Sequence, residues 1–334
     1  MSRRAWLLFA AASLLWGFPY FLIKVAIVDL SPVFVVFGRA AIAAAVLVPV
    51  AALRGLLPAL RGRLRFVVAL SLVHIVGPFL LITYGELYVT SSLAGLIIAV
   101  EPVVVGLMLA RAEPFTPTRV VGLVLGFGGV AVLTGVELGG GGPAVIGAAL
   151  VLLATVGYAY ATIMIQRRGS DIPPTALVAG SMLSSTVLLA PFAAFALPTP
   201  PVRSTSWASL AALGLFCTAI AMIAFYALIA DVGPNKAGLV TYVNPLVAVL
   251  LGVALLDEPL RWSLPVGAVL ILAGCWLSTR RPRPARPAES AEAAPVASAA
   301  SAQPVAWSRS VAPTEPARSV TSVESAQPVA VESS

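Results

Sequence analysis

Ten apolar runs follow one another along the first 279 residues of this 334-residue chain. Each is close to the ~20 residues that an α-helix needs to cross the hydrocarbon core of a bilayer. They lack the strict alternation of apolar and polar residues that marks the strands of a membrane barrel. The runs are 5–28, 32–53, 64–85, 90–110, 119–136, 144–165, 175–197, 207–229, 236–256 and 262–279. The pattern predicts an all-α polytopic membrane protein with ten transmembrane helices.

The composition excludes a water-soluble fold. Hydrophobic residues make up 59% of the chain and charged residues only 10%, whereas soluble domains carry about 25% charged residues. The formal net charge of +7 comes from residues in short loops that form no nucleic-acid-binding patch. Cys217 and Cys275 lie inside apolar runs, where small core side chains are common. We therefore expect a multi-pass cell-membrane protein that contacts lipid and no nucleic acid.

The distribution of basic residues predicts the orientation in the membrane. If the N-terminus is cytoplasmic, the outer loops carry only Arg203 and Arg261, and Lys24 lies near the outer end of the first run. Cytoplasmic loops carry the excess of Lys and Arg in membrane proteins. Both termini are thus predicted to be cytoplasmic. The inner side then receives Arg3, Arg4, Arg54, Arg61, Arg63, Arg65, Arg111, Arg119, Arg167, Arg168, Lys236, Arg280, Arg281, Arg283 and Arg286.

Residues 280–334 differ in kind from the rest. They contain eight prolines and no Leu, Ile or Phe, so they cannot form a packed core. The sequence predicts a disordered, Pro/Ala/Ser-rich cytoplasmic tail.

The two halves of the apolar region, 5–136 and 144–279, resemble each other. Glu101-Pro102 matches Asn244-Pro245 at an offset of 143, and Gly122 matches Gly267 at an offset of 145. Each half holds five predicted helices. Because five is odd, the second half must enter the membrane upside down relative to the first, which is a recurrent arrangement in secondary transporters. This favours a transporter over a channel.

These residues resemble the two EamA-type repeats of the drug/metabolite transporter superfamily. The resemblance rests on Leu15-Trp16-Gly17 with Lys24, on Ser31-Pro32 with Arg39, and on the duplicated Pro and Gly blocks. It implies ten helices, a central cavity and export or exchange of small metabolites. The second half departs from the pattern, because Val156 and Met164 stand where the first half has Trp and Lys.

Glu101 is the strongest candidate for a functional side chain. It lies midway along its run, where a charged residue is costly and usually faces protein or water. Pro102 removes a backbone donor and loosens the preceding turn. A carboxylate there suits an ammonium group or a proton, and Asn244 is predicted to form the opposite wall of the same substrate site. The alternative is a hydrogen-bonded Glu101, or one that pairs with His74 or Arg39.

Two other ionisable side chains lie within the apolar runs. His74, the only histidine, titrates near neutral pH and is a candidate proton relay or a buried side chain bonded to a hydroxyl group. Arg39 keeps its charge in proteins, so it either pairs with an acidic group or holds a substrate carboxylate. Glu101, His74 and Arg39 are therefore the candidates for proton coupling or ion pairing.

Aromatic residues are predicted at the same depth as Glu101. Trp16 and Tyr20 share a helix face because they are four residues apart. Together with Tyr158 and Tyr242, they are candidates for the walls of a substrate cavity, since aromatic rings bind apolar groups and cations. Simple core packing is the alternative for each of them.

The fifth and tenth runs, 119–136 and 262–279, are rich in glycine and nearly free of charge. Glycines permit close helix contact in membranes, so these helices are predicted to form a scaffold or a homodimer face. Glu113-Pro114 and Glu258-Pro259 precede these runs and are predicted to cap or punctuate helix junctions.

The sequence predicts a secondary transporter, an exporter of small metabolites such as amino acids or drug-like organic cations, that works by alternating access. It has no Gly-rich phosphate loop with Lys-Ser/Thr, no metal-binding motif and no catalytic motif. We therefore expect no cofactor, no metal and no enzymatic activity. The alternatives are a membrane-embedded enzyme that acts on lipid, and a channel or facilitator without ion coupling.

Overall fold

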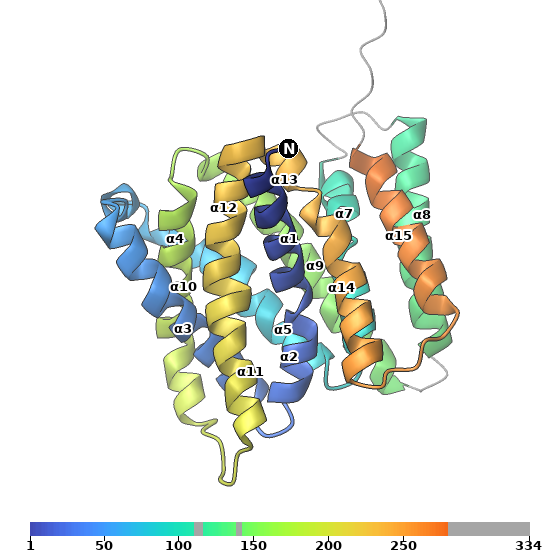
Figure 1. Cartoon of the computed structure of the whole chain (residues 1–334), viewed down its shortest axis with the longest axis horizontal. Coiled ribbons are helices and arrows are strands. Elements are labelled where there is room, and N and C mark those ends of the chain that lie inside the picture. The colour runs from blue at the N-terminus through green and yellow to red at the C-terminus, as the bar shows by residue number, and fades with distance from the viewer. Residues whose placement is uncertain (110–115, 138–141, 280–334) are drawn as a thin grey trace, which may run out of the picture. The chain divides into compact units, whose positions relative to one another are not determined.

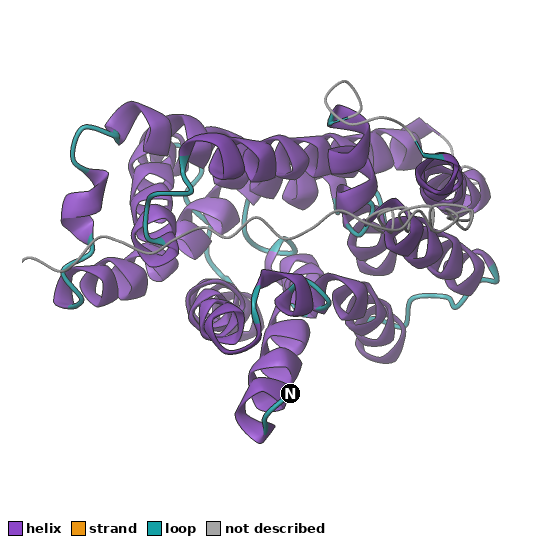
Figure 2. Cartoon of the chain, turned by 90° about the horizontal axis from the view of Figure 1, so that it is seen from above, coloured by secondary structure: helices purple, strands orange, loops and turns teal. Residues whose placement is uncertain are grey.

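The computed structural model describes residues 1–109, 116–137 and 142–279, and within these ranges it contains helices and loops but no β-strand (Figure 1). Figure 2 shows the same helices from above, joined mostly by short loops. The predicted all-α fold is confirmed. Glu113 and the predicted disordered tail, 280–334, lie outside the described residues.

The described part of the first repeat contains eight α-helices, and several pairs of them stack end to end into one span. Its helices are α1 (Arg3–Gly17), α2 (Pro19–Ala26), α3 (Pro32–Leu53), α4 (Leu64–Ser71), α5 (Gly77–Gly85), α6 (Ser91–Ile98), α7 (Glu101–Met108) and α8 (Pro117–Glu137). The short segments are the 3₁₀ turn η1 (Leu57–Leu60) and the π-helical turn η2 (Leu72–Val76), which joins α4 to α5.

The second repeat is built from fewer and longer helices. They are α9 (Gly142–Arg168), α10 (Pro174–Ala194), α11 (Ser204–Gly214), the π-helical turn η4 (Leu215–Ile220), α12 (Ala221–Val232), α13 (Pro234–Ala237), α14 (Val240–Leu255) and α15 (Ser263–Thr279). In the described residues, eight helical spans are long and apolar enough to cross a membrane, while α14 and α15 are shorter apolar helices. That these two also cross the membrane stays a prediction.

Polar side chains next to the apolar runs determine where several helices begin. Ser31 accepts a hydrogen bond from the backbone N–H of Phe34, and Thr90 accepts one from that of Leu93, which satisfies donors that lack a partner in the first helical turn. The carboxylate of Glu258 accepts hydrogen bonds from the backbone N–H groups of Ser91 (2.7 Å) and Ser92 (3.0 Å). The predicted role of Glu258 at a helix junction is confirmed: it caps α6 from the other repeat.

The equivalent helices α8 and α15 pack against each other and run antiparallel. A Cβ atom on Gly122 would lie 2.8 Å from the carbonyl oxygen of Gly274, and one on Gly129 would lie 2.9 Å from that of Gly267. Because Gly122 corresponds to Gly267 and Gly129 to Gly274, each glycine meets the counterpart of the other. A two-fold axis between inverted repeats produces this cross-pairing.

The glycine-rich faces of α8 and α15 are thus in contact within one chain. Their opposite faces carry large exposed apolar side chains, such as Val124 on α8 and Val269 on α15, which are 66% and 67% exposed. Such surfaces fit a lipid environment. A homodimer through these two helices would use the exposed faces, and it stays a prediction.

Two ion pairs join the repeats at opposite ends of α3. Asp29 follows α2 and pairs with Arg203, which precedes α11; the Nε–Oδ2 distance is 2.9 Å. Asp171 follows α9 and pairs with Arg63, which precedes α4; the Nη2–Oδ2 distance is 2.6 Å. Both aspartates lie three residues before the proline that begins the next helix. The two pairs are therefore equivalent positions of the repeat.

Candidate functional site

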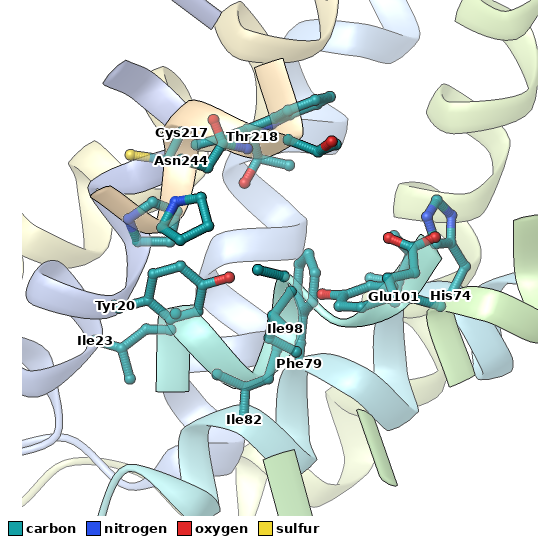
Figure 3. A pocket seen from close by; sticks show the side chains of 18 of the residues that line it. Tyr20, Ile23, His74, Phe79, Ile82, Ile98, Glu101, Cys217, Thr218 and Asn244 are labelled. Carbon is teal, nitrogen blue, oxygen red and sulfur yellow. The ribbon is translucent and has the colours of Figure 1, made fainter. Parts of the chain in front are cut away.

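A cavity of about 210 Å³ lies between the two repeats (Figure 3). The first repeat contributes lining residues from α1, α2, α3, η2, α5, α6, the α6–α7 junction and α7, and the second contributes them from α9, η4, α12 and α14. None of the described lining residues belongs to α8, α10 or α15. This agrees with the predicted scaffold role of the fifth and tenth runs.

The helices around the cavity are interrupted where they reach it. Phe18 separates α1 from α2 before Pro19, and Ala99 and Val100 separate α6 from α7 before Pro102. Proline lacks the N–H that would continue the helical hydrogen bonds. The π-helical turns η2 and η4 begin at Leu72 and Leu215, 143 residues apart. Both repeats therefore have a local irregularity at the same place. Such π-turns insert an extra residue into a helix and are frequent at functional sites.

Glu101 begins α7 and lines the cavity. Its Oε1 atom accepts a hydrogen bond from Oγ1 of Thr162 on α9 at 2.9 Å. The predicted alternative of a hydrogen-bonded Glu101 therefore matches the structure, with Thr162 as the partner in place of His74 or Arg39. One hydroxyl group leaves most of the carboxylate's acceptor capacity unused, so Glu101 can accept further hydrogen bonds from a bound molecule.

Arg39 lines the cavity from α3 and is only 8% exposed. Its Nε atom donates to Oγ1 of Thr218 at 2.9 Å, and its guanidinium carbon lies 3.9 Å from the ring centroid of Phe79. The stack on Phe79 and the single hydrogen bond to a neutral hydroxyl group fix the orientation of the guanidinium plane. Among the described residues, no ion pair involves Arg39. The structure thus does not show the acidic partner that was one of its two predicted roles.

His74 lies in η2, and its ring meets the ring of Tyr158 edge to face, with centroids 5.8 Å apart. In the view of Figure 3, His74 and Glu101 appear on one side of the cavity and Tyr20 on the other. His74 therefore lies at the candidate site, although among the described residues it has an aromatic neighbour and no hydroxyl partner.

Asn244 lines the cavity from α14, the equivalent of the span that carries Glu101. With its amide nitrogen turned toward α1, it lies 3.1 Å from the carbonyl oxygen of Ser13 and 2.9 Å from that of Val240. Asn244 thus ties α14 to α1 in addition to facing the cavity.

The comparisons with known proteins agree with this architecture. The model of the EamA-like transporter family matches residues 3–135 and 145–280, one copy for each repeat. The chain belongs to the EamA-like transporter family. The relatives described below are transporters, so this chain is a membrane transporter and not an enzyme.

Three relatives and one solved structure show the extent of the similarity. An uncharacterized transporter of Archaeoglobus fulgidus is 26% identical over 83% of this chain and 99% of its own length. The uncharacterized transporter YvbV of Bacillus subtilis is 28% identical over 84% and 93%, and the uncharacterized inner membrane transporter YedA of Escherichia coli is 29% identical over 81% and 92%. A crystal structure with 23% identity and a TM-score of 0.60, covering 82% of this chain and 96% of that chain, shares the fold.

The aromatic candidates of this EamA-like chain divide into two groups. Trp16, Tyr20 and Tyr158 line the cavity. Tyr242 does not, and it packs against the apolar cluster that contains Leu96. Residues two apart on a helix point to nearly opposite sides, and Asn244 occupies the cavity side of α14. A role of Tyr242 in substrate binding stays a prediction.

Sequence reasoning missed three side chains at the site. Thr162 and Thr218 bind Glu101 and Arg39, and Phe79 stacks on Arg39. A signal for Thr162 was available, because it follows Tyr158 by four residues and so shares its helix face. For Thr218, the only signal in the sequence was the repeat offset. Thr218 follows Cys217, which lies 143 residues after His74 and is therefore its equivalent.

Proposed function

We propose that this chain is a secondary transporter that exports small zwitterionic metabolites, amino acids above all, by alternating access. The observation that carries the proposal is a small cavity lined by both Glu101 and Arg39. Neither side chain forms an ion pair with a described residue. An amino acid brings an ammonium group for the carboxylate and a carboxylate for the guanidinium. Guanidinium groups bind carboxylates through two parallel hydrogen bonds.

The size of the cavity also supports a small solute. Pockets for drug-sized ligands usually measure about 300–1,000 Å³, and this one measures about 210 Å³. The aromatic walls offered by Trp16, Tyr20 and Tyr158 suit an apolar side chain. A drug-like organic cation is the second candidate, because Glu101 and the rings bind cations, but it would leave Arg39 without a function in binding.

Alternating access is supported by the arrangement of the repeats. The cavity lies where they meet, and irregular backbone borders it on both sides, as in transporters whose broken helices form the substrate site. The basic loops favour cytoplasmic termini, and in a bacterial host this corresponds to the inner membrane. Glu101 binds either the substrate ammonium or a proton, so we propose coupling to protons, with His74, which lines the same cavity, as a relay.

The direct test is counterflow in proteoliposomes that contain the purified full chain. A labelled neutral amino acid is the probe, and its decarboxylated amine and its deaminated carboxylic acid are the competitors. We expect the zwitterion to compete best. In Arg39→Gln, the amine should compete almost as well as the zwitterion. In Glu101→Gln, the carboxylic acid should compete almost as well as the zwitterion. Arg65→Gln and Asp257→Asn, which change exposed side chains, are the matched controls.

The same vesicles test the rival functions and the coupling. Single-channel currents would favour a channel, and turnover of lipid would favour an enzyme. If neither analogue changes its rank in the two variants, the cavity is not the zwitterion site. Accumulation driven by a pH gradient should fall in Glu101→Gln, and undiminished accumulation at every pH would reject coupling through this residue.

A further inference from the structure

One acidic side chain that the proposed mechanism does not use is completely buried. Glu86 directly follows α5, is 0% exposed, and neither of its carboxylate oxygens has a hydrogen-bond partner. Ile82 lies one helical turn before it and lines the cavity. Glu86 therefore lies just beyond the end of the cavity that the charge pattern assigns to the outside.

No described group donates a hydrogen bond to the carboxylate of Glu86. The positive charges of Lys24 and Arg39 favour its ionised form, but burial, which is the largest effect, and the negative charge of Glu258 oppose it. Lys24 of α2 donates a hydrogen bond to the backbone carbonyl of Glu86, so its ammonium is held by the main chain, and no ion pair with the carboxylate is formed. The other titratable or charged neighbours are Tyr20 of α2, Arg39 of α3 and Glu258 after α14. Glu258 repels a negative charge and is itself bound to the start of α6.

An ionised carboxylate without a donor is among the most costly groups to bury, and such groups take up a proton instead. The carboxyl group of Glu86 is therefore neutral as long as the outer end of the cavity is packed as it is here. If that end opens, water can solvate the carboxylate and accept its proton. Burial of Glu86 and binding of one proton are then linked.

We infer that Glu86 is a proton-binding site, separate from Glu101, and that binding of a proton from the outer water closes the outer end of the cavity. The step is the association of one proton with the carboxylate on closure and its release to the outer water on opening. The inference deepens the proposed function, since it assigns a controlling proton to the transport cavity.

The test measures access to the outer end at different external pH values. Ile82→Cys, in a chain with Cys217→Ala and Cys275→Ala, is labelled in proteoliposomes with a membrane-impermeant maleimide. We expect labelling to rise with external pH, by up to about tenfold per pH unit, the limit for one linked proton. Glu86→Gln, which resembles the protonated form, should be labelled slowly at every pH. Comparing both reporters at the same pH removes the effect of ionisation of the reporter thiol itself.

Two controls separate this inference from the proposed function. Glu101→Gln in the reporter should keep the rise with pH, and in that variant infrared difference spectra should show a protonated carboxylic acid that disappears when Glu86→Gln is added. Three results would overturn the inference. The first is an equal rise of labelling with pH in the reporters with and without Glu86→Gln. The others are loss of that rise in Glu101→Gln and absence of the infrared band of the protonated carboxylic acid. Labelling that follows Glu86 in a chain without counterflow would reject the transport function and leave the proton site intact.

Discussion

The first repeat brings the charges Glu101 and Arg39 to the cavity, whereas the second repeat has neutral residues at the equivalent positions. Asn244 corresponds to Glu101 at the offset of 143. Ser181 corresponds to Arg39, because each lies seven residues after the proline that begins its helix. The symmetry thus determines the fold and not the chemistry. Under the proposed function, the first repeat holds both charges of a zwitterionic ligand, and the second repeat provides a wall that moves against it.

The two repeats also differ in where their helices are interrupted. The first repeat interrupts its helices at Phe18 and at Ala99, whereas α9 continues through the position equivalent to Phe18. The second repeat has its own break slightly earlier, at 238–239, between α13 and α14. Gly157 and Tyr158, the counterparts of Gly17 and Phe18, lie inside one long helix. Both repeats therefore have breaks near the cavity, which free backbone groups, but the breaks lie at different positions in the two repeats.

The largest effect is expected when the asymmetry of charge is removed. Glu101→Gln should weaken binding of a zwitterionic substrate by at least about 2 kcal/mol, or about thirtyfold, because a buried charge pair loses one partner. Moving the carboxylate across the cavity, with Glu101→Gln and Asn244→Glu together, should restore part of the affinity. Equilibrium binding of a labelled amino acid in detergent measures both. Equal affinity in wild type and Glu101→Gln would show that the first repeat does not hold the ammonium.

A smaller effect is expected when the shape of the positive group changes and its charge is kept. Arg39→Lys loses the flat stack on Phe79 and the hydrogen bond from Nε to Thr218, and an ammonium does not offer the two-pronged geometry of guanidinium. We expect about tenfold weaker binding, the equivalent of about 1.4 kcal/mol. Ser181→Ala, at the equivalent position, removes a buried hydroxyl group that has no partner and should leave binding unchanged. Identical losses in the two variants would contradict a one-sided site.

Local sequence patterns were sufficient to predict the fold but only part of the site. Run length and repeat offset identify helices and their equivalents, because bilayer thickness and helix geometry fix both. Glu101 was visible because a charge in an apolar run is rare. Its partner Thr162 and the stack of Phe79 on Arg39 depend on contacts between helices far apart in the sequence, which no local pattern encodes. Glu86 stayed hidden because it follows the end of its run, where polar residues are usually exposed.

The packing of α8 against α15 offers a prediction on stability. A Cβ atom on Gly274 would overlap the backbone of Gly122 and Gly126, which cannot move aside as a side chain can. Gly274→Ala should therefore destabilise the protein by about 1–3 kcal/mol. Gly128→Ala on α8 has no atom within 4 Å of the new methyl group and should be neutral or slightly stabilising, since alanine favours helix. Thermal unfolding in detergent compares the two, and equal transition temperatures would argue against close contact between the repeats here.

The smallest effect concerns the two equivalent ion pairs. Asp29 accepts hydrogen bonds from Nε, Nη2 and the backbone N–H of Arg203 and from Ser206, and the Arg203 guanidinium and Ser206 hydroxyl lower the pKa of Asp29 to about 2. Asp171 accepts one hydrogen bond from Arg63 and has a side chain that is 59% exposed.

Asp29→Asn should thus lower stability slightly and Asp171→Asn should hardly change it, because exposed ion pairs contribute little. The sign of the pH dependence follows from the lowered pKa. The contribution of Asp29 is fully present above its ordinary pKa, near 3.8, and is lost as the pH falls toward 2. Unfolding followed between pH 5 and pH 2 should show this loss in wild type and in Asp171→Asn, but not in Asp29→Asn. If Asp171→Asn abolished the loss instead, the pair of Asp171 with Arg63 would be the tighter of the two connections, and the pair of Asp29 with Arg203 would be the one that separates more readily.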